Sequence, residues 1–93
     1  MRAIYKYLIP VQNEFEIPMP VSSEVLAVQV QHGVPCIWCL LNPGNATKNR
    51  KFRIYPTGFE IPDKYIDAMR YVGTFQLEEG DFIGHLFEVK YDA

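Results

Sequence analysis

Two cysteines stand three positions apart in the run Cys36-Ile37-Trp38-Cys39. A C-x-x-C pair can exchange disulfides when a helix N-terminus lowers the pKa of one thiol, and it can supply half of a zinc site. The flanking residues instead predict a β-strand, in which side chains three positions apart face opposite ways. We therefore expect two reduced, buried structural thiols, with no metal site and no cofactor.

The histidines and carboxylates do not predict a convergent acid–base site. His32 fits a tight turn before Gly33. His85 is expected opposite Thr74 on a strand face, where a packed, hydrogen-bonded histidine is commoner than a catalyst. The carboxylates fall at turns or on exposed strand faces, where they favour solubility and protect sheet edges. No P-loop, G-x-S-x-G or G-x-G-x-x-G sequence occurs, so we predict no catalytic residue and no enzymatic activity.

Basic residues gather beside the polar segment 42–49, in a chain whose formal net charge is −2. Guanidinium, ammonium and aromatic groups can together hold a phosphate and stack on a nucleobase. The candidate phosphate-binding residues are Lys48, Arg50, Lys51 and Arg53, and the candidate stacking residues are Tyr55 and Trp38. The alternative is a solvated strand edge guarded by Lys and Arg, which is the commoner origin of such a cluster.

A second candidate surface is the strand face expected to carry Ala27, Gln29 and Trp38. An indole over a small residue and beside an amide can contact a ligand or a partner subunit. The alternative is that this face packs against the rest of the β structure, which burial statistics slightly favour.

Turn residues punctuate the chain at short intervals, which is typical of an all-β sandwich or barrel. The predicted strands span 2–9, 14–19 (at an edge), 25–31, 34–41, 50–55, 59–61, 70–78 and 81–91. Residues 62–69 are expected to form one or two helical turns. The predicted fold is all-β, or β-rich α+β: a small antiparallel sandwich or barrel of about seven strands in a single domain, 1–93.

Two of the turns set the strand registers. His32-Gly33 closes the first hairpin and places Leu26 opposite Cys39. Glu79-Gly80 closes the second and places Phe75 opposite Gly84, where an aromatic ring can cover a strand glycine.

Composition narrows the class of protein. The 93 residues are 48% hydrophobic and 22% charged, which predicts one folded domain and not a disordered chain. The charge balance lacks the basic excess of DNA-binding proteins, so no specific DNA binding is expected. No long apolar run occurs, which predicts a cytosolic protein without membrane attachment. An aromatic content of 14% in so small a domain favours a homo-oligomer.

Several segments in combination resemble a group of small uncharacterised proteins of tailed bacteriophages and prophages. These are IYKY (4–7), VQVQHGVPCIW (28–38), FRIYPTG (52–58), YVGTFQ (71–76) and HLFEV (85–89). The resemblance covers nearly the whole chain. It implies that the protein acts in a phage context. It assigns no function to any residue of this chain, because the group bears only a domain-of-unknown-function label. Small phage accessory proteins without enzymatic motifs often act by stoichiometric binding.

We therefore expect a non-enzymatic phage accessory protein that antagonises host antiviral defence by sequestering a nucleotide-type signal in the host cytosol. One alternative is a blocker of a host defence protein, acting through an exposed strand edge or an aromatic face. Another is a minor structural protein of the virion.

Overall fold

The computed structural model describes residues 1–91, in which seven strands and two short helical segments follow one another along the chain. The strands are β1 (Ala3–Leu8), β2 (Glu14–Pro20), β3 (Glu24–Gln31), β4 (Val34–Leu41), β5 (Thr47–Pro56), β6 (Met69–Leu77) and β7 (Phe82–Val89). A single α-helical turn, α1 (Asp63–Ile66), precedes β6, and a 3₁₀ turn, η1 (Glu78–Gly80), joins β6 to β7. The predicted all-β fold of about seven strands with one short helix is confirmed.

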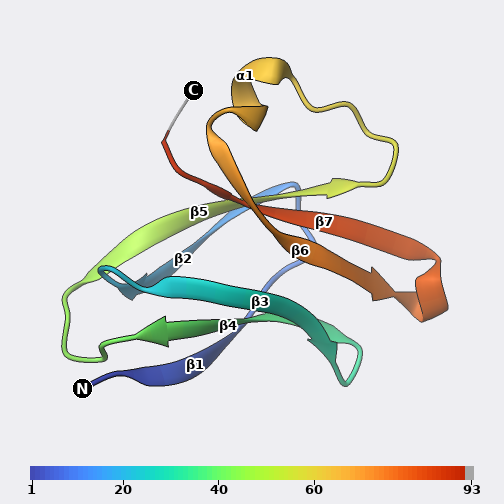
Figure 1. The fold of residues 1–93 in the computed structure, drawn as a ribbon. Coiled ribbons are helices and arrows are strands. Elements are labelled where there is room, and N and C mark those ends of the chain that lie inside the picture. The colour runs from blue at the N-terminus through green and yellow to red at the C-terminus, as the bar shows by residue number, and fades with distance from the viewer. Residues whose placement is uncertain (92–93) are drawn as a thin grey trace.

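The strands form two antiparallel sheets with the orders β1-β4-β3 and β2-β5-β7-β6. Figure 1 shows them as a lower and an upper layer, with α1 above the upper one. Alternate residues of each strand point between the layers, where Ile37 from one sheet and Phe52 from the other are fully buried. Phe52 also stacks on Phe15, with ring centroids 5.5 Å apart. Removing this apolar surface from water holds the two layers together.

The first hairpin joins β3 and β4 through His32 and Gly33, both at positive φ. The predicted register holds next to the turn, where Val28 pairs with Ile37. The predicted pairing of Leu26 with Cys39 is wrong. Leu26 is the extra residue of a β-bulge, and Val25 takes its place opposite Cys39.

The second hairpin joins β6 and β7 and has Phe75 opposite Gly84, as predicted. A Cβ atom on Gly84 would lie 2.7 Å from Cζ of Phe75, so the ring occupies the space that the glycine leaves. Beyond this point a bulge at Val72 shifts the register, which places Arg70 opposite Glu88.

The predicted strand positions differ from the structure mainly at 50–55, at 59–61 and at 81–91, the last of which is the shorter β7, Phe82–Val89. β5 begins at Thr47, ahead of the expected 50–55, because the ladder with β2 continues to the pair Pro20–Thr47. Residues 59–61 form no strand, because the Phe59 N–H donates to the Pro56 carbonyl in a turn that leads the chain away from the sheet. The predicted helical segment 62–69 is reduced to the one turn of α1.

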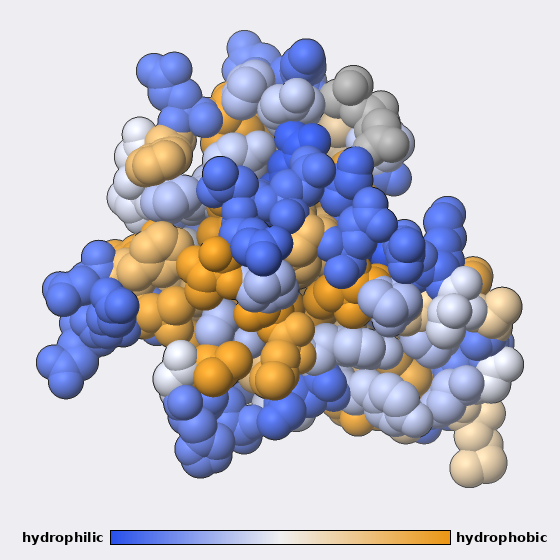
Figure 2. All heavy atoms as spheres, turned by 180° about the vertical axis from the view of Figure 1, so that it is seen from behind, coloured by the Kyte–Doolittle hydropathy of each residue, from blue (hydrophilic) through white to orange (hydrophobic). Residues whose placement is uncertain are grey.

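The bulged strands β3 and β6 are sheet edges that pack against each other. A Cβ on Gly73 would lie 2.7 Å from Cγ1 of Val28, so the two edges meet closely. Bulges bend a strand and increase its twist, which brings these edges together. β1 and β2 remain as the opposite edges, so the predicted edge position of β2 is confirmed. The rear view in Figure 2 shows apolar side chains gathered at the centre of that face, with hydrophilic side chains around them.

Candidate functional site

A groove of about 520 Å³ lies where β5 and β7 diverge. β5 pairs with β7 only from Phe52 onward, whereas its earlier residues pair with β2 alone. β7 leaves β5 at Glu88 and continues beside β6 to the pair Met69–Val89. Figure 1 shows the resulting fork between the start of β5 and the end of β7.

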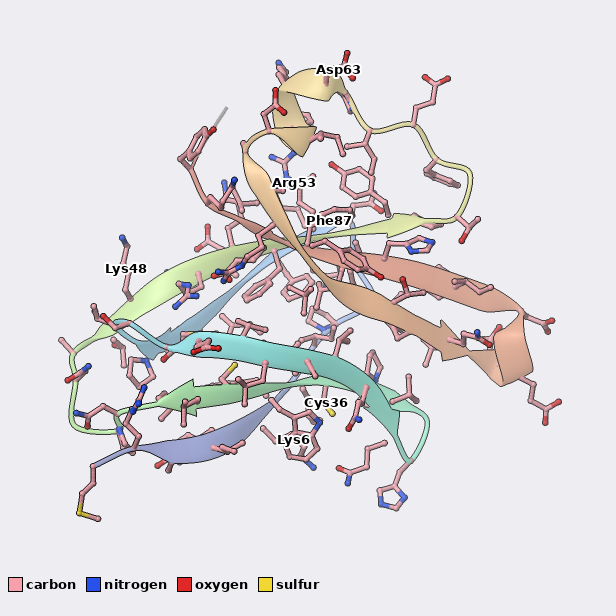
Figure 3. The ribbon with its side chains drawn as sticks, in the orientation of Figure 1. Lys6, Cys36, Lys48, Arg53, Asp63 and Phe87 are labelled. Carbon is pink, nitrogen blue, oxygen red and sulfur yellow. The ribbon has the colours of Figure 1, made fainter. Side chains whose placement is uncertain are left out.

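The groove is strongly basic. Its lining residues are Glu16, Lys48, Asn49, Arg50, Lys51, Arg70, Glu88, Val89, Lys90 and Tyr91. Five of them are cationic and two are anionic, an excess of three positive charges in a chain whose net charge is −2. Figure 3 shows Lys48 extending outward from the start of β5. Such a concentration of cationic groups attracts anions.

One buried carboxylate organises the floor of the groove. Glu88 is only 4% exposed, because alternation along β7 turns it toward the interior. Its Oε2 accepts from Nε of Arg50 at 2.5 Å, and its Oε1 accepts from an Nη of Arg70 at 2.7 Å. Arg50 also donates to the carbonyl of Ser23 at 3.0 Å. Both guanidinium groups are therefore held in place before any ligand arrives.

The same network reaches the core thiol. Burial raises the pKa of Cys39 to about 11; the positive charge of Arg50 opposes this rise, and the negative charge of Glu88 adds to it. The thiol is therefore protonated and unreactive at neutral pH. Cys39 belongs to the core between the sheets, whereas Cys36 lies on the outer face of β4, so the two thiols face opposite ways as predicted.

Alternation along β5 divides the predicted phosphate-binding residues. Lys48 and Arg50 lie on the core side of the strand, and Lys51 lies on the other side, yet all three line the groove. Arg53 and Tyr55 do not. They line a separate hollow of about 300 Å³ with the aromatic rings of Phe59 and Tyr65.

Arg53 is already engaged within that second hollow. Its Nε lies 3.0 Å from Oε2 of Glu14, in an ion pair whose geometry does not make a hydrogen bond. Its guanidinium carbon lies 4.1 Å from the centroid of the Tyr65 ring. Burial lowers the pKa of Arg53, but hydrogen bonding to Tyr55 and the charge of Glu14 outweigh this and raise it overall. Figure 3 places Arg53 on the upper sheet, below α1.

Trp38 lies on the outer face of the other sheet, away from both hollows. Its Nε1 donates to Oε1 of Gln29 at 2.9 Å, and it pairs in register with Ala27 and Lys6. The predicted grouping of Trp38 with Gln29 and Ala27 on one face is thus found, but Trp38 is not brought to the basic residues. The same face buries Cys36 completely.

His85 lies opposite Thr74, as predicted, and both of its ring nitrogens have partners. Nε2 lies 2.7 Å from the Thr57 hydroxyl, and Nδ1 lies 2.9 Å from the Thr74 hydroxyl. Thr74 in turn lies 2.5 Å from the hydroxyl of Tyr71. This chain of hydrogen bonds ties β6, β7 and the turn after β5 together on the outer sheet face.

Sequence reasoning missed Arg70, Glu88, Lys90 and Tyr91, which the fold brings to the groove. One signal was present. Glu88 follows Gly84 and Leu86 at inward positions of β7, and a carboxylate at such a position needs cationic partners. The bulge at Val72, which brings Arg70 opposite Glu88, could not be predicted from the sequence.

A family model described as a domain of unknown function, DUF7352, matches residues 1–93. The chain belongs to this family. The domain-of-unknown-function part of the resemblance is thus confirmed, and the description names neither an activity nor a source. No curated protein and no solved structure gives a match. No helix within residues 1–91 combines the length and hydrophobicity needed to cross a bilayer.

Proposed function

We propose that this DUF7352 protein is a non-enzymatic binding protein that holds a small phosphate-bearing ligand of the nucleotide type in the groove between β5 and β7. The biological use we propose is sequestration of such a nucleotide as a signal of antiviral defence, in the cytosol of a phage-infected cell. The phage-like sequence segments motivate that use, and the groove motivates the chemistry.

The observation that carries the proposal is the fixation of Arg50 and Arg70 by the buried Glu88. One carboxylate cannot neutralise two guanidinium groups, so the triad keeps a positive charge. Each guanidinium has five N–H donors, and the contacts with Glu88 and Ser23 leave donors on both arginines for an oxyanion. Phosphate suits this arrangement because it accepts several charge-assisted hydrogen bonds at once.

The groove also offers an aromatic ring. Tyr91 lies at its rim, 60% exposed, and its hydroxyl donates to the carbonyl of Asp67 at 3.1 Å. A ring held at one end can stack on a nucleobase at small entropic cost. We therefore propose Tyr91 as the stacking residue, in place of Tyr55 and Trp38, which lie elsewhere.

Calorimetry against a panel of cyclic and ADP-ribose-type nucleotides tests this function. Lys48→Glu should weaken binding by about tenfold or more, because it replaces an attractive charge at the groove with a repulsive one. Lys64→Glu is the matched control: it makes the same charge change on α1, outside the groove, and should leave the affinity nearly unchanged.

Tyr91→Leu separates the two parts of the ligand. It should weaken nucleotide binding while leaving the weaker binding of inorganic pyrophosphate intact, since only the nucleotide has a base to stack. No heat from any nucleotide or from pyrophosphate would refute the proposal, as would equal effects of Lys48→Glu and Lys64→Glu.

A further inference from the structure

The four sheet edges within residues 1–91 differ in how well they are protected from pairing with another strand. β2 carries Pro18 and Pro20, which cannot donate to a new ladder. β3 and β6 each carry a bulge and pack against each other. β1 is a regular strand with neither proline nor bulge among its residues. An edge of this kind readily accepts a further strand.

Lysine is the usual guard of such an edge, and β1 has one at its centre. The Nζ of Lys6, however, donates to Oε1 of Gln31 at 2.7 Å. Gln31 belongs to β3, on the far side of β4, so the lysine is drawn back across the sheet and away from the edge. Figure 3 shows Lys6 beside Cys36 on the lower sheet. Meanwhile Ile4 and Leu8 are 60% and 62% exposed.

The backbone shows which β1 residues are available for pairing. The N–H of Ile9 donates to the carbonyl of Pro35 at 3.1 Å, so Ile9 directs its polar groups toward β4. Along an antiparallel strand, the backbone N–H and C=O groups of successive residues point alternately to the two sides of the strand. Ile4, Lys6 and Leu8 therefore direct their N–H and C=O groups to the open side of β1.

We infer that β1 pairs with β1 of a second copy of this chain, antiparallel about a two-fold axis at Tyr5. This register places Ile4 opposite Lys6 of the second copy, and Arg2 opposite its Leu8. Each cation then lies beside an aliphatic side chain. The Ile4–Lys6 and Arg2–Leu8 pairs direct their backbone groups at each other, whereas Tyr5 faces Tyr5 in a non-hydrogen-bonded pair. An axis at Lys6 would instead place two lysines opposite each other. The result is a continuous six-stranded sheet across the dimer.

A second copy of this chain is the partner that we infer, because its β1 side chains complement those of the first copy in this register. The β1 edge is cationic, and an antiparallel copy shifted to the Tyr5 axis is the arrangement that buries Ile4 and Leu8 without opposing like charges. The groove between β5 and β7 lies on the other sheet, so this inference does not depend on the proposed function.

Sedimentation of the intact chain over a concentration series should give a species of twice the 10.8 kDa chain mass. Ile4→Lys should weaken the dimer by about tenfold or more, because it sets a lysine opposite Lys6 and removes an apolar contact. Leu26→Lys is the matched control on an exposed leucine of β3 in the same sheet, and it should leave the mass unchanged. Far-ultraviolet circular dichroism checks that both variants fold.

Cysteine cross-linking tests the register directly. Because Cys39 pairs with residue 5 across β1 and β4, the variants are made in a Cys39→Ala background. With a mild oxidant, Tyr5→Cys should then form a disulfide-linked dimer, because residues at the axis form a close, non-hydrogen-bonded pair. Lys6→Cys should not. A monomer at every concentration, or cross-linking of Lys6→Cys in preference to Tyr5→Cys, would overturn the inference.

Discussion

At the scale of single residues, Glu88 and Cys39 show how the interior of the sandwich treats ionisable groups. Glu88 is buried, and its ion pairs with Arg50 and Arg70 compensate for the hydration that it loses. At Cys39 the charge of Arg50 offsets the effect of burial only in part, so the thiol stays neutral at neutral pH. Tyr7 follows the same rule: burial raises its pKa, and the nearby Cys39 and Tyr5 add to the effect.

Cys39 makes stability depend on alkaline pH. Its folded-state pKa of about 11 lies above the ordinary value of 9.0, so the unfolded chain loses the thiol proton first. This contribution to stability is therefore complete below pH 9 and is lost as pH rises to about 11. The loss should be about 2 to 3 kcal/mol in urea denaturation.

Cys39→Ala should flatten this pH dependence, leaving the smaller part that comes from Tyr7. Cys36→Ala is the control: it retains Cys39 and should therefore show the same loss of stability between pH 9 and about 11 as the unmodified protein. An unchanged slope in Cys39→Ala would show that the thiol does not control stability in this range.

At the scale of elements, two bulges decide how the sandwich closes and where its site forms. The bulge at Leu26 bends β3, and the bulge at Val72 bends β6 toward it. The second bulge also brings Arg70 opposite Glu88, so one extra residue both closes the sheet edge and completes the charged network.

Gly73 is the point at which this closure should be most sensitive. Gly73→Ala would set a Cβ 2.7 Å from Cγ1 of Val28, and β-branched Val28 has little freedom to move away. We expect a loss of about 1 to 2 kcal/mol of stability in urea denaturation. In a Val28→Ala background the same substitution should cost much less. Equal costs in the two backgrounds would show that the contact between β3 and β6 is not tight.

At the scale of the whole molecule, the two sheets have separate tasks in our proposals. The sheet β2-β5-β7-β6 carries the basic groove, and β1 at the edge of the other sheet carries the self-pairing surface. The packed core and the contact between β3 and β6 connect the two sheets, and the latter contact involves neither the groove nor β1.

Ligand binding and dimer formation should therefore be independent. Lys48→Glu should leave the sedimenting mass unchanged, and Ile4→Lys should leave the calorimetric affinity for nucleotide unchanged within about twofold. Measuring both properties on both variants checks this. A loss of nucleotide affinity in Ile4→Lys would indicate that the second copy contributes to the groove.

The sequence by itself determined the fold class, most strand positions and the pairing next to each turn, because turn chemistry and alternation are local. It also located part of the groove, since Lys48, Arg50 and Lys51 are close together in the chain. Arg70, Glu88 and Tyr91 joined them only in the tertiary structure, and Arg53, Tyr55 and Trp38 were separated from them. A bulge inserts a single extra residue, which hardly changes the composition of a strand. It nevertheless shifts the cross-strand partner of every residue beyond it. The divergence of β5 from β7 likewise depends on how whole sheets twist, which is a property of the packed molecule.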